Sequence, residues 1–402
     1  MNQADEELNT LVLNKELGGR KKLALGLYVH VPFCSTTCDF CAFYQEKPSK
    51  KGMDAYFTGL RDEISRFSPD RPPSTIFFGG GTPGLLQPDQ LDLLCGLINN
   101  LELECGAEWS IELAPSEVSP EKLKVLRNHG VNRISMGVQT FDPKFMDALG
   151  RKHPVEKTIS AYSMIRDAGF SSINLDLLFG APGQSLEDWE SDLARAVELQ
   201  PDHLSTYCLS FEEDTAMYVR LSEGQVRIDP EKEADFYEFA WDYLPAHGYD
   251  QYEISNYAKP GHACLHNLNT WGMNEWIGYG PSACSQYHGI RRKNIANPEE
   301  WAIGLQTGNQ PKYMEAEKLS SLGFARDAVL FGLRMNQGIN LPHIATQFKL
   351  NQSVFTEYTP FLERLCEEGL ANKGEPGSYR LTKQGRILCD AIACDLPELT
   401  AN

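Results

Sequence analysis

The segment "YVHVPFCSTTCDFCAFY" (residues 28–44) decides how the fold is interpreted, because it joins an apolar strand pattern to three cysteines. Cys34, Cys38 and Cys41 are spaced as CxxxCxxC, directly after a run that is typical of a buried strand. Folds built from parallel strands place their functional groups at the carboxyl ends of those strands. The three thiols are therefore expected in a loop at the functional edge of a sheet.

Three interpretations of this triplet compete: inert cysteines, a zinc site and an iron–sulfur cluster. Scattered cysteines are usually buried and chemically inert, and we expect this for Cys95, Cys208 and Cys366. A zinc site usually has four ligands, from paired CxxC motifs or from histidines at set spacing, and no second pair follows here. A 4Fe–4S cluster binds one thiolate per iron, so three thiolates leave one iron open to a small molecule. The spacing favours the cluster.

Apolar strand patterns alternate with amphipathic helical patterns from about residue 23 to 210. Nearly continuous apolar strands indicate burial on both faces, as in a parallel sheet covered by helices. An open doubly wound sheet and a barrel remain alternatives at this point. Ser185 is expected to cap a helix with Asp188, and Gly130 to end one. The predicted strands are 23–31, 74–80, 108–114, 132–138, 171–180 and 203–210, and helical patterns lie at 90–101, 120–130 and 186–199.

The rest of the chain consists of two segments that differ in residue composition. Aromatic and glycine-rich segments fill residues 216–311, and helical patterns at 324–335 and 353–370 are followed by two short strands around a turn. Helices before a small hairpin predict a winged-helix-like module. The predicted division is an N-terminal segment 1–22, a core 23–215, an extension 216–311 and a C-terminal domain 312–402.

Composition limits the function. The 402 residues carry a formal net charge of −18, so a polyphosphate partner is disfavoured and no nucleic acid is expected. The start lacks the apolar core of a secretory signal, and no run is long enough to span a membrane. Eleven cysteines without a secretory signal suit a reducing, cytoplasmic location. Peripheral contact with a membrane remains compatible with the sequence, because a surface helix needs no span.

Polar groups follow the other predicted strands. In "FFGGGTPGLL" Gly80, Gly81 and Thr82 end the second strand, where backbone without side chains can approach a ligand and donate N–H groups. "IELAP" places Glu112 at the end of the third strand. Gln139, Arg151 and Asp176 lie on or just after later strands; three such groups are costly to bury without partners, which favours a ligand pocket. Structural roles are the alternative for each.

In combination these motifs resemble one branch of the radical S-adenosylmethionine (SAM) proteins. The branch contains the oxygen-independent coproporphyrinogen III oxidases and the related HemW-type heme chaperones. The resemblance runs from about residue 23 to the C-terminus, and implies an α/β fold: an open (β/α)6 partial TIM barrel of radical SAM type with a C-terminal helical, winged-helix-like domain. The segments that carry it are "YVHVPFCSTTCDFC", "FFGGGTP", "ISMGVQTFD", "ALGRKH", "INLDLLFGAPGQ", "YEISNYAKPG" and "HNLNTW".

Two features place the chain on the chaperone side of that resemblance. The oxidases carry a further cysteine two residues after the triplet and a long N-terminal extension, whereas this chain has Phe43 there and only 27 residues before Tyr28. The chaperones carry an HNxxYW motif. "CLHNLNTW" supplies His266, Asn267 and Trp271, with threonine at the tyrosine position.

The resemblance implies a role for each matched residue. Cys34, Cys38 and Cys41 would hold the 4Fe–4S cluster, whose open iron chelates the amino and carboxylate groups of SAM before a 5′-deoxyadenosyl radical forms. Groups that match a second SAM site of the oxidases are Gln139, Arg151 and Asp176. Ala114 departs from the usual asparagine of the "ExNP" stretch. The residues expected to contact SAM are Tyr28, Phe40, Gly80, Gly81, Thr82 and Glu112.

The implied function is binding heme and passing it to an acceptor protein, with an electron donor of flavodoxin or ferredoxin type. His266 is a candidate heme ligand, because imidazole commonly ligates heme iron, although an isolated histidine is more often a bonded core residue. A radical enzyme acting on a porphyrin or porphyrinogen, by oxidative decarboxylation or methyl transfer, is the main alternative. A heme-independent scaffold stabilised by its cluster is the other.

Overall fold

The computed structural model describes residues 24–151, 154–307 and 313–399, so the predicted N-terminal segment 1–22 lies outside the described residues. Its main feature is a twelve-stranded sheet in the order β12-β11-β10-β9-β1-β2-β3-β4-β5-β6-β8-β7. The end strands, β12 and β7, lie at opposite edges of that order. The sheet is therefore open and not a closed barrel, as the resemblance implied.

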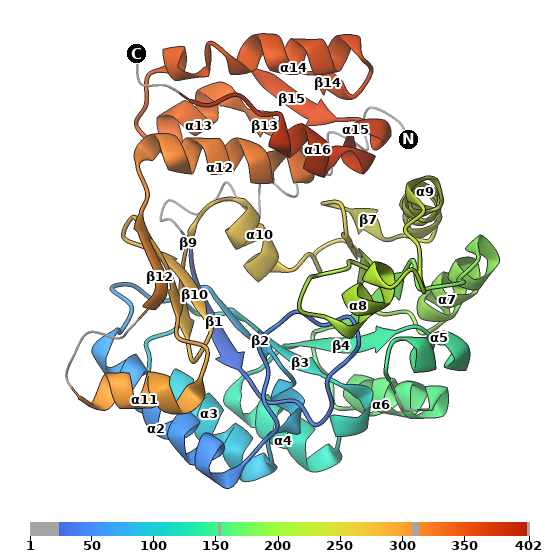
Figure 1. Ribbon diagram of the computed structural model, residues 1–402. Helices are drawn as coiled ribbons and strands as arrows, with labels where there is room; N and C mark the ends of the chain where they lie inside the picture. Colours follow the sequence, from blue (N-terminus) through green and yellow to red (C-terminus); the bar gives the residue numbers. More distant parts are fainter. Residues whose placement is uncertain (1–23, 152–153, 308–312, 400–402) are drawn as a thin grey trace.

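The strands β1 to β6 form the parallel part of the sheet and follow sequence order (Figure 1). Nearly all of their residues are buried, because helices cover one face and the strands' own polar and aromatic side chains fill the other. Each predicted strand is confirmed to within two residues. The bounds are β1 Leu25–Val31, β2 Thr75–Gly80, β3 Glu108–Leu113, β4 Arg133–Gln139, β5 Ser172–Phe179 and β6 His203–Cys208.

The helices between these strands pack on the outer face of the sheet (Figure 1). The expected caps are present: Ser185 and Asp188 form a reciprocal capping box at the start of α7, and Gly130 ends α4 with a φ of 96°. No described helix is both long and apolar enough to cross a membrane. The bounds are α2 Lys50–Arg66, α3 Pro88–Asn99, α4 Pro120–His129, α5 Pro143–Ala148, α6 Val155–Asp167 and α7 Leu186–Glu198, with 3₁₀ turns η1 Pro83–Leu85 and η2 Pro115–Glu117.

Residues 216–318 extend the same sheet at both edges. Strand β9 pairs in parallel with β1, and β8 pairs antiparallel with β6. The boundaries between core, extension and C-terminal domain stay predictions; β12, inside the predicted C-terminal range, pairs with β11 of the extension. The elements are α8 Ala216–Ser222, α9 Pro230–Ala246, β7 Asp250–Gln251, β8 Asn256–Ala258, α10 Leu265–Trp271, β9 Glu275–Tyr279, β10 Cys284–Tyr287, β11 Ile290–Asn294, α11 Pro298–Gln306 and β12 Tyr313–Lys318.

A buried carboxyl group attaches this extension to α2. Glu63 accepts the Gly280 N–H at 2.7 Å and the side-chain amide of Asn294 at 2.8 Å. Burial raises the pKa of Glu63 to about 7. Such a group is stable in the interior only because donors meet both of its oxygens.

The C-terminal module combines helices with a small sheet of order β13-β15-β14, as the sequence predicts (Figure 1). Arg386 attaches it to the rest of the molecule, because its Nη1 donates to Gln251 at 2.7 Å and its guanidinium lies 4.6 Å from the ring centroid of Trp241. Its elements are α12 Ser321–Arg334, β13 Ile339–Asn340, α13 Leu341–Gln347, η3 Gln352–Phe355, α14 Tyr358–Glu367, β14 Ala371–Lys373, β15 Ser378–Leu381, α15 Lys383–Ile387 and α16 Cys389–Cys394.

The contact between α2 and α11 depends on a glycine. A Cβ at Gly59 would lie 2.5 Å from the Trp301 ring, whereas a Cβ at Gly96 in α3 would meet nothing within 4 Å. We expect Gly59→Ala to lower the free energy of unfolding by about 1–3 kcal/mol through overpacking. Gly96→Ala, the control, should be neutral or stabilise by up to about 1 kcal/mol. Urea unfolding measures both, and equal effects would contradict this packing.

Candidate functional site

The three cysteines lie on the loop between β1 and α2, at the carboxyl end of the first strand as expected. All three are partly exposed and reduced. The Cys41 N–H donates to the Cys38 carbonyl at 3.2 Å, which turns the chain between these two residues. The Cys34 thiol lies 3.3 Å from the Thr82 hydroxyl, so the cysteine loop and the glycine turn after β2 are in contact.

Asp39, between two of the cysteines, connects this loop to distant segments by hydrogen bonds and an ion pair. Its N–H donates to the Leu149 carbonyl at 3.3 Å, and its own carbonyl accepts the Met217 N–H at 2.9 Å. Its carboxylate pairs with Arg220 of α8 at 2.5 Å, and Arg220 also donates to the Ala148 carbonyl. The loop is thus fixed by α5 and by the extension, independently of any bound group.

The glycine turn fits closely against β1. A Cβ at Gly81 would lie 2.7 Å from the Phe33 carbonyl oxygen, and one at Gly80 would lie 2.5 Å from the His30 ring. Gly80 also has a φ of 109°, a left-handed conformation that side chains disfavour. These glycines are therefore required for packing beside the cysteine loop, and their predicted contact with SAM stays a prediction.

Tyr28, Phe40 and Glu112, three further residues predicted to contact SAM, have different surroundings. The Tyr28 hydroxyl lies 3.0 Å from His30 Nδ1, and the Gly80 N–H donates to Glu112 at 3.3 Å. Burial raises the pKa of Glu112 to about 8, and the neighbouring Asp176 adds to the rise. Phe40 packs with residues that include Leu149, Leu178, Leu209 and Met217.

The second predicted group gathers around Gly137 of β4. Asp176 lies opposite Gly137 in the β4–β5 register, and accepts hydrogen bonds from Ser135 at 2.9 Å and Asn174 at 2.8 Å. A Cβ at Gly137 would lie 3.2 Å from the Gln139 amide and 3.9 Å from the Arg151 guanidinium. The structure therefore brings together Gln139, Arg151 and Asp176, which are spread over 38 residues of sequence.

Arg151 also acts on the cysteines. Burial raises the pKa of each of the three thiols, and the positive charge of Arg151 opposes that rise in every case. Arg151 Nε is buried without a hydrogen-bond partner among the described residues. The thiolate is the form that binds iron, so this cation favours the ligating state.

The placement of the thiols bears on the choice between a single ion and a cluster. Within residues 24–151, 154–307 and 313–399, no three His, Cys, Asp or Glu side chains are placed to hold one metal ion. A shared zinc ion needs its sulfur ligands about 2.3 Å away, and hence convergent. In a cubane each thiolate meets its own iron, so convergence on one point is not needed. The assignment of Cys34, Cys38 and Cys41 as ligands of a 4Fe–4S cluster stays a prediction.

His266 lies at the other end of the strands. Its ring nitrogen Nδ1 is 3.0 Å from the hydroxyl of Thr75, the first residue of β2, and its backbone N–H donates to Glu108, the first residue of β3. Burial lowers the pKa of His266 to about 4, and Arg133 contributes to this decrease. The residue is 8% exposed, and its ligation of heme iron stays a prediction.

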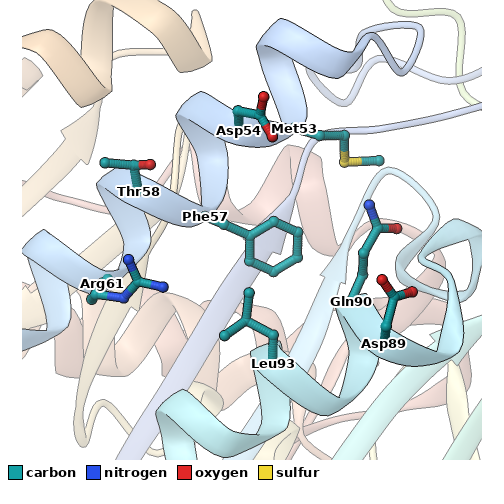
Figure 2. Close-up of a pocket in the computed structure, with 8 residues that line it drawn as sticks. All are labelled: Met53, Asp54, Phe57, Thr58, Arg61, Asp89, Gln90 and Leu93. Atoms are coloured by element: carbon teal, nitrogen blue, oxygen red, sulfur yellow. The ribbon is translucent and has the colours of Figure 1, made fainter.

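One groove lies away from these residues. It has a volume of about 390 Å³ between α2 and α3. Figure 2 shows Phe57 and Leu93 facing each other across it, with Asp54, Arg61 and Asp89 around the rim. None of the predicted site residues lines it.

Comparisons with known proteins identify the family. The model of the radical SAM superfamily matches residues 28–196. The protein named heme chaperone HemW from Bacillus subtilis is 34% identical over 371 residues, which cover 91% of this chain and 97% of that protein. The chain belongs to the HemW family. The Escherichia coli HemW relative is 38% identical over 64% of this chain and 69% of its own length.

The fold comparison agrees with membership of the HemW family. The coproporphyrinogen III oxidase HemN of Escherichia coli, described as a radical SAM enzyme, superposes with a TM-score of 0.79 at 25% sequence identity. The match covers 95% of this chain and 92% of that one. The resemblance proposed from the sequence motifs is thereby confirmed at the level of family and fold.

Sequence reasoning missed the residues that position the cysteine loop. Asp39 stands inside the triplet, but its partner Arg220 is 181 residues away. His30 of β1 is also among them: it is buried, its Nδ1 lies 3.0 Å from the Tyr28 hydroxyl, and its Nε2 lies 3.3 Å from the Tyr44 carbonyl of the loop. A carboxylate between two cysteines was a signal for Asp39, whereas nothing in the sequence identified its partner.

The raised pKa of Glu112 predicts a pH-dependent stability. Its folded pKa of about 8 exceeds the ordinary value of 4.5, so the folded state holds this proton more tightly than the unfolded chain. The stabilising contribution is complete below the unfolded pKa and is lost as pH rises through the folded one. We expect wild type to lose stability relative to Glu112→Gln between about pH 5 and about pH 9 in urea unfolding of the metal-free protein. A difference that stays constant with pH would contradict this placement of the carboxyl group.

Proposed function

We propose that the chain is a heme chaperone that binds heme and transfers it to an acceptor protein. The observation that carries the proposal is its 34% identity to the Bacillus subtilis heme chaperone HemW over 97% of that protein. The cysteine loop supports it, because the position of the further oxidase cysteine holds Phe43, whose side chain is 69% exposed. No fourth sulfur from that position competes for the open iron.

In this proposal the cysteine loop binds the cluster. Cys34, Cys38 and Cys41 supply three thiolates, Arg151 favours their ionised form, and Asp39 with Arg220 holds the loop in place. A bound 4Fe–4S cluster with SAM on its open iron supplies one-electron chemistry. Glu112 offers a carboxyl group next to the glycine turn, suited to the amine or ribose hydroxyls of SAM.

The proposed partners follow from this chemistry. Reduction of a cluster requires an electron donor, of flavodoxin or ferredoxin type, and heme transfer requires an acceptor. The cytoplasm is the proposed location, because all eleven cysteines of the chain are free, as expected in a reducing compartment.

A radical enzyme acting on a porphyrinogen is the second candidate. It is supported by the match to coproporphyrinogen III oxidase over 95% of this chain and by the grouping of Gln139, Arg151 and Asp176 around Gly137. That candidate requires 5′-deoxyadenosine to form in step with a modified tetrapyrrole.

One experiment separates the two. Anaerobically reconstituted protein is titrated with heme, mixed with an apo-acceptor, and assayed in parallel for 5′-deoxyadenosine with coproporphyrinogen III. The chaperone proposal expects stoichiometric heme uptake, release to the acceptor and no steady turnover. Sustained conversion of the porphyrinogen, with one 5′-deoxyadenosine or more per product, would replace it by the enzymatic candidate.

A further inference from the structure

A cationic, apolar pocket lies where the end of α2 meets the β10–β11 turn. It has a volume of about 290 Å³, and the residues that line it are Arg66, Phe67, Ser68, Ile277, Tyr287, His288, Ile290 and Arg292. Two arginines and a histidine line its walls, and the Asp70 carboxylate lies 3.3 Å from Nε2 of that histidine, His288. Apolar side chains beside two guanidinium groups suit a ligand that is both apolar and anionic.

We propose that this pocket receives one edge of heme, with His288 as a ligand to the iron and with Arg66 and Arg292 facing the propionates. The proposal rests on the proposed chaperone function and names its binding site. Heme combines a flat apolar ring with two carboxylates. The pocket walls offer apolar side chains for the ring and guanidinium groups for the carboxylates.

His288 is placed as an accessible ligand. Its side chain is 60% exposed, and its Nε2 lies 3.3 Å from the Asp70 carboxylate. Its backbone N–H donates to Glu275 at 2.7 Å, which fixes the residue at the tip of the hairpin. A carboxylate on one ring nitrogen orients an imidazole and strengthens the other nitrogen as a metal ligand. His266, by contrast, is 8% exposed and bonded at the floor of the sheet.

Arg292 provides a fixed positive charge. Its guanidinium lies between the rings of Phe67 and Tyr313, 4.9 and 4.8 Å from their centroids, and Nη1 donates to the Tyr313 hydroxyl at 2.7 Å. Arg66 is exposed in the last turn of α2, and its side chain can reach an anion at the rim. Guanidinium groups pair well with carboxylates because their donors match the two oxygens.

The size and place of the pocket suit a carrier. Ligand pockets usually measure about 300–1,000 Å³, so a ring as large as heme would enter by one edge and leave the other in solvent for an acceptor. The cysteine loop precedes α2, and residues at the opposite end of that helix line the pocket. The 17 residues of α2 span about 25 Å, so heme bound here is held away from the radical site.

The test uses the full-length, anaerobically reconstituted chain titrated with ferric heme. His288→Ala should shift the Soret band and change the electron paramagnetic resonance signal of the ferric heme. Arg66→Glu should weaken heme binding about tenfold or more. The matched controls are His343→Ala, an exposed histidine of the C-terminal module, and Arg61→Glu on the same helix α2; both should behave as wild type.

Each result decides the inference. A His288→Ala spectrum identical to wild type overturns it, whatever Arg66→Glu does, and a change of that signal in His266→Ala alone transfers the ligand to α10. Wild type that binds no heme overturns the proposed function as well, so the two failures are distinguishable. Both test residues are exposed, and circular dichroism verifies that the variants fold.

Discussion

Cys38→Ser is expected to abolish the iron–sulfur cluster while leaving the fold intact. Iron should fall from about four atoms per chain to well below one after anaerobic reconstitution, because a hydroxyl replaces a soft thiolate ligand. The visible absorption of the cluster should disappear with it. Cys38 is partly exposed, and the loop keeps its Asp39–Arg220 pair, so circular dichroism should not change.

Cys105→Ser is the matched control, because Cys105 is also a reduced cysteine but lies exposed outside the cysteine loop. It should retain wild-type iron, sulfide and absorption. Equal iron content in both variants, or zinc in both, would contradict the assignment of the three thiols as cluster ligands.

Gly80→Ala is expected to destabilise the protein by about 2–5 kcal/mol. The φ of 109° costs a side chain about 1–2 kcal/mol, and overpacking against the His30 ring adds about 1–3 kcal/mol. His30 also contacts the Tyr44 carbonyl, so the strain reaches the cysteine loop. Urea unfolding measures the loss, and SAM binding to the reconstituted protein should weaken in parallel.

The control for this change is Gly106→Ala. Gly106 has a φ of 76°, but a Cβ there would meet nothing within 4 Å. It should therefore lose only the backbone contribution, about 1–2 kcal/mol, and keep SAM binding. If the two variants lose the same stability, the close packing of Gly80 on His30 is not what requires glycine there.

The parallel core was predictable because its physical signals are local. Strands buried on both faces are continuously apolar, and Ser185, Asp188 and Gly130 mark helix ends by short-range hydrogen bonds and by backbone conformation. The cysteine triplet was predictable for the same reason, since three thiols within eight residues must share one loop.

The remaining features depend on residues that are distant in sequence. Strand β9 pairs with β1, with Glu275 opposite Leu25, and no local sequence pattern predicts that pairing. Arg220 holds Asp39 from 181 residues away. His266 was predicted from its motif, but its burial against Thr75 and Glu108 arises only when α10 docks at the start of the strands.

These distant contacts gather the residues considered above at the two opposite ends of the parallel strands. At the carboxyl ends of the strands lie the cysteine loop, the glycine turn and Glu112, which we propose hold the cluster and SAM. At the opposite end, α10 and the β10–β11 turn carry the two histidines considered for heme. In the proposal made above, heme binds at that second end, away from the cysteine loop.

The open iron of the cluster is the claim on which the rest depends, and Mössbauer spectroscopy of ⁵⁷Fe-reconstituted protein tests it most directly. With three cysteine ligands, about one iron in four should change its signal when SAM is added. Four irons that do not respond to SAM, or a preparation that holds zinc with its three thiols intact, would contradict the account.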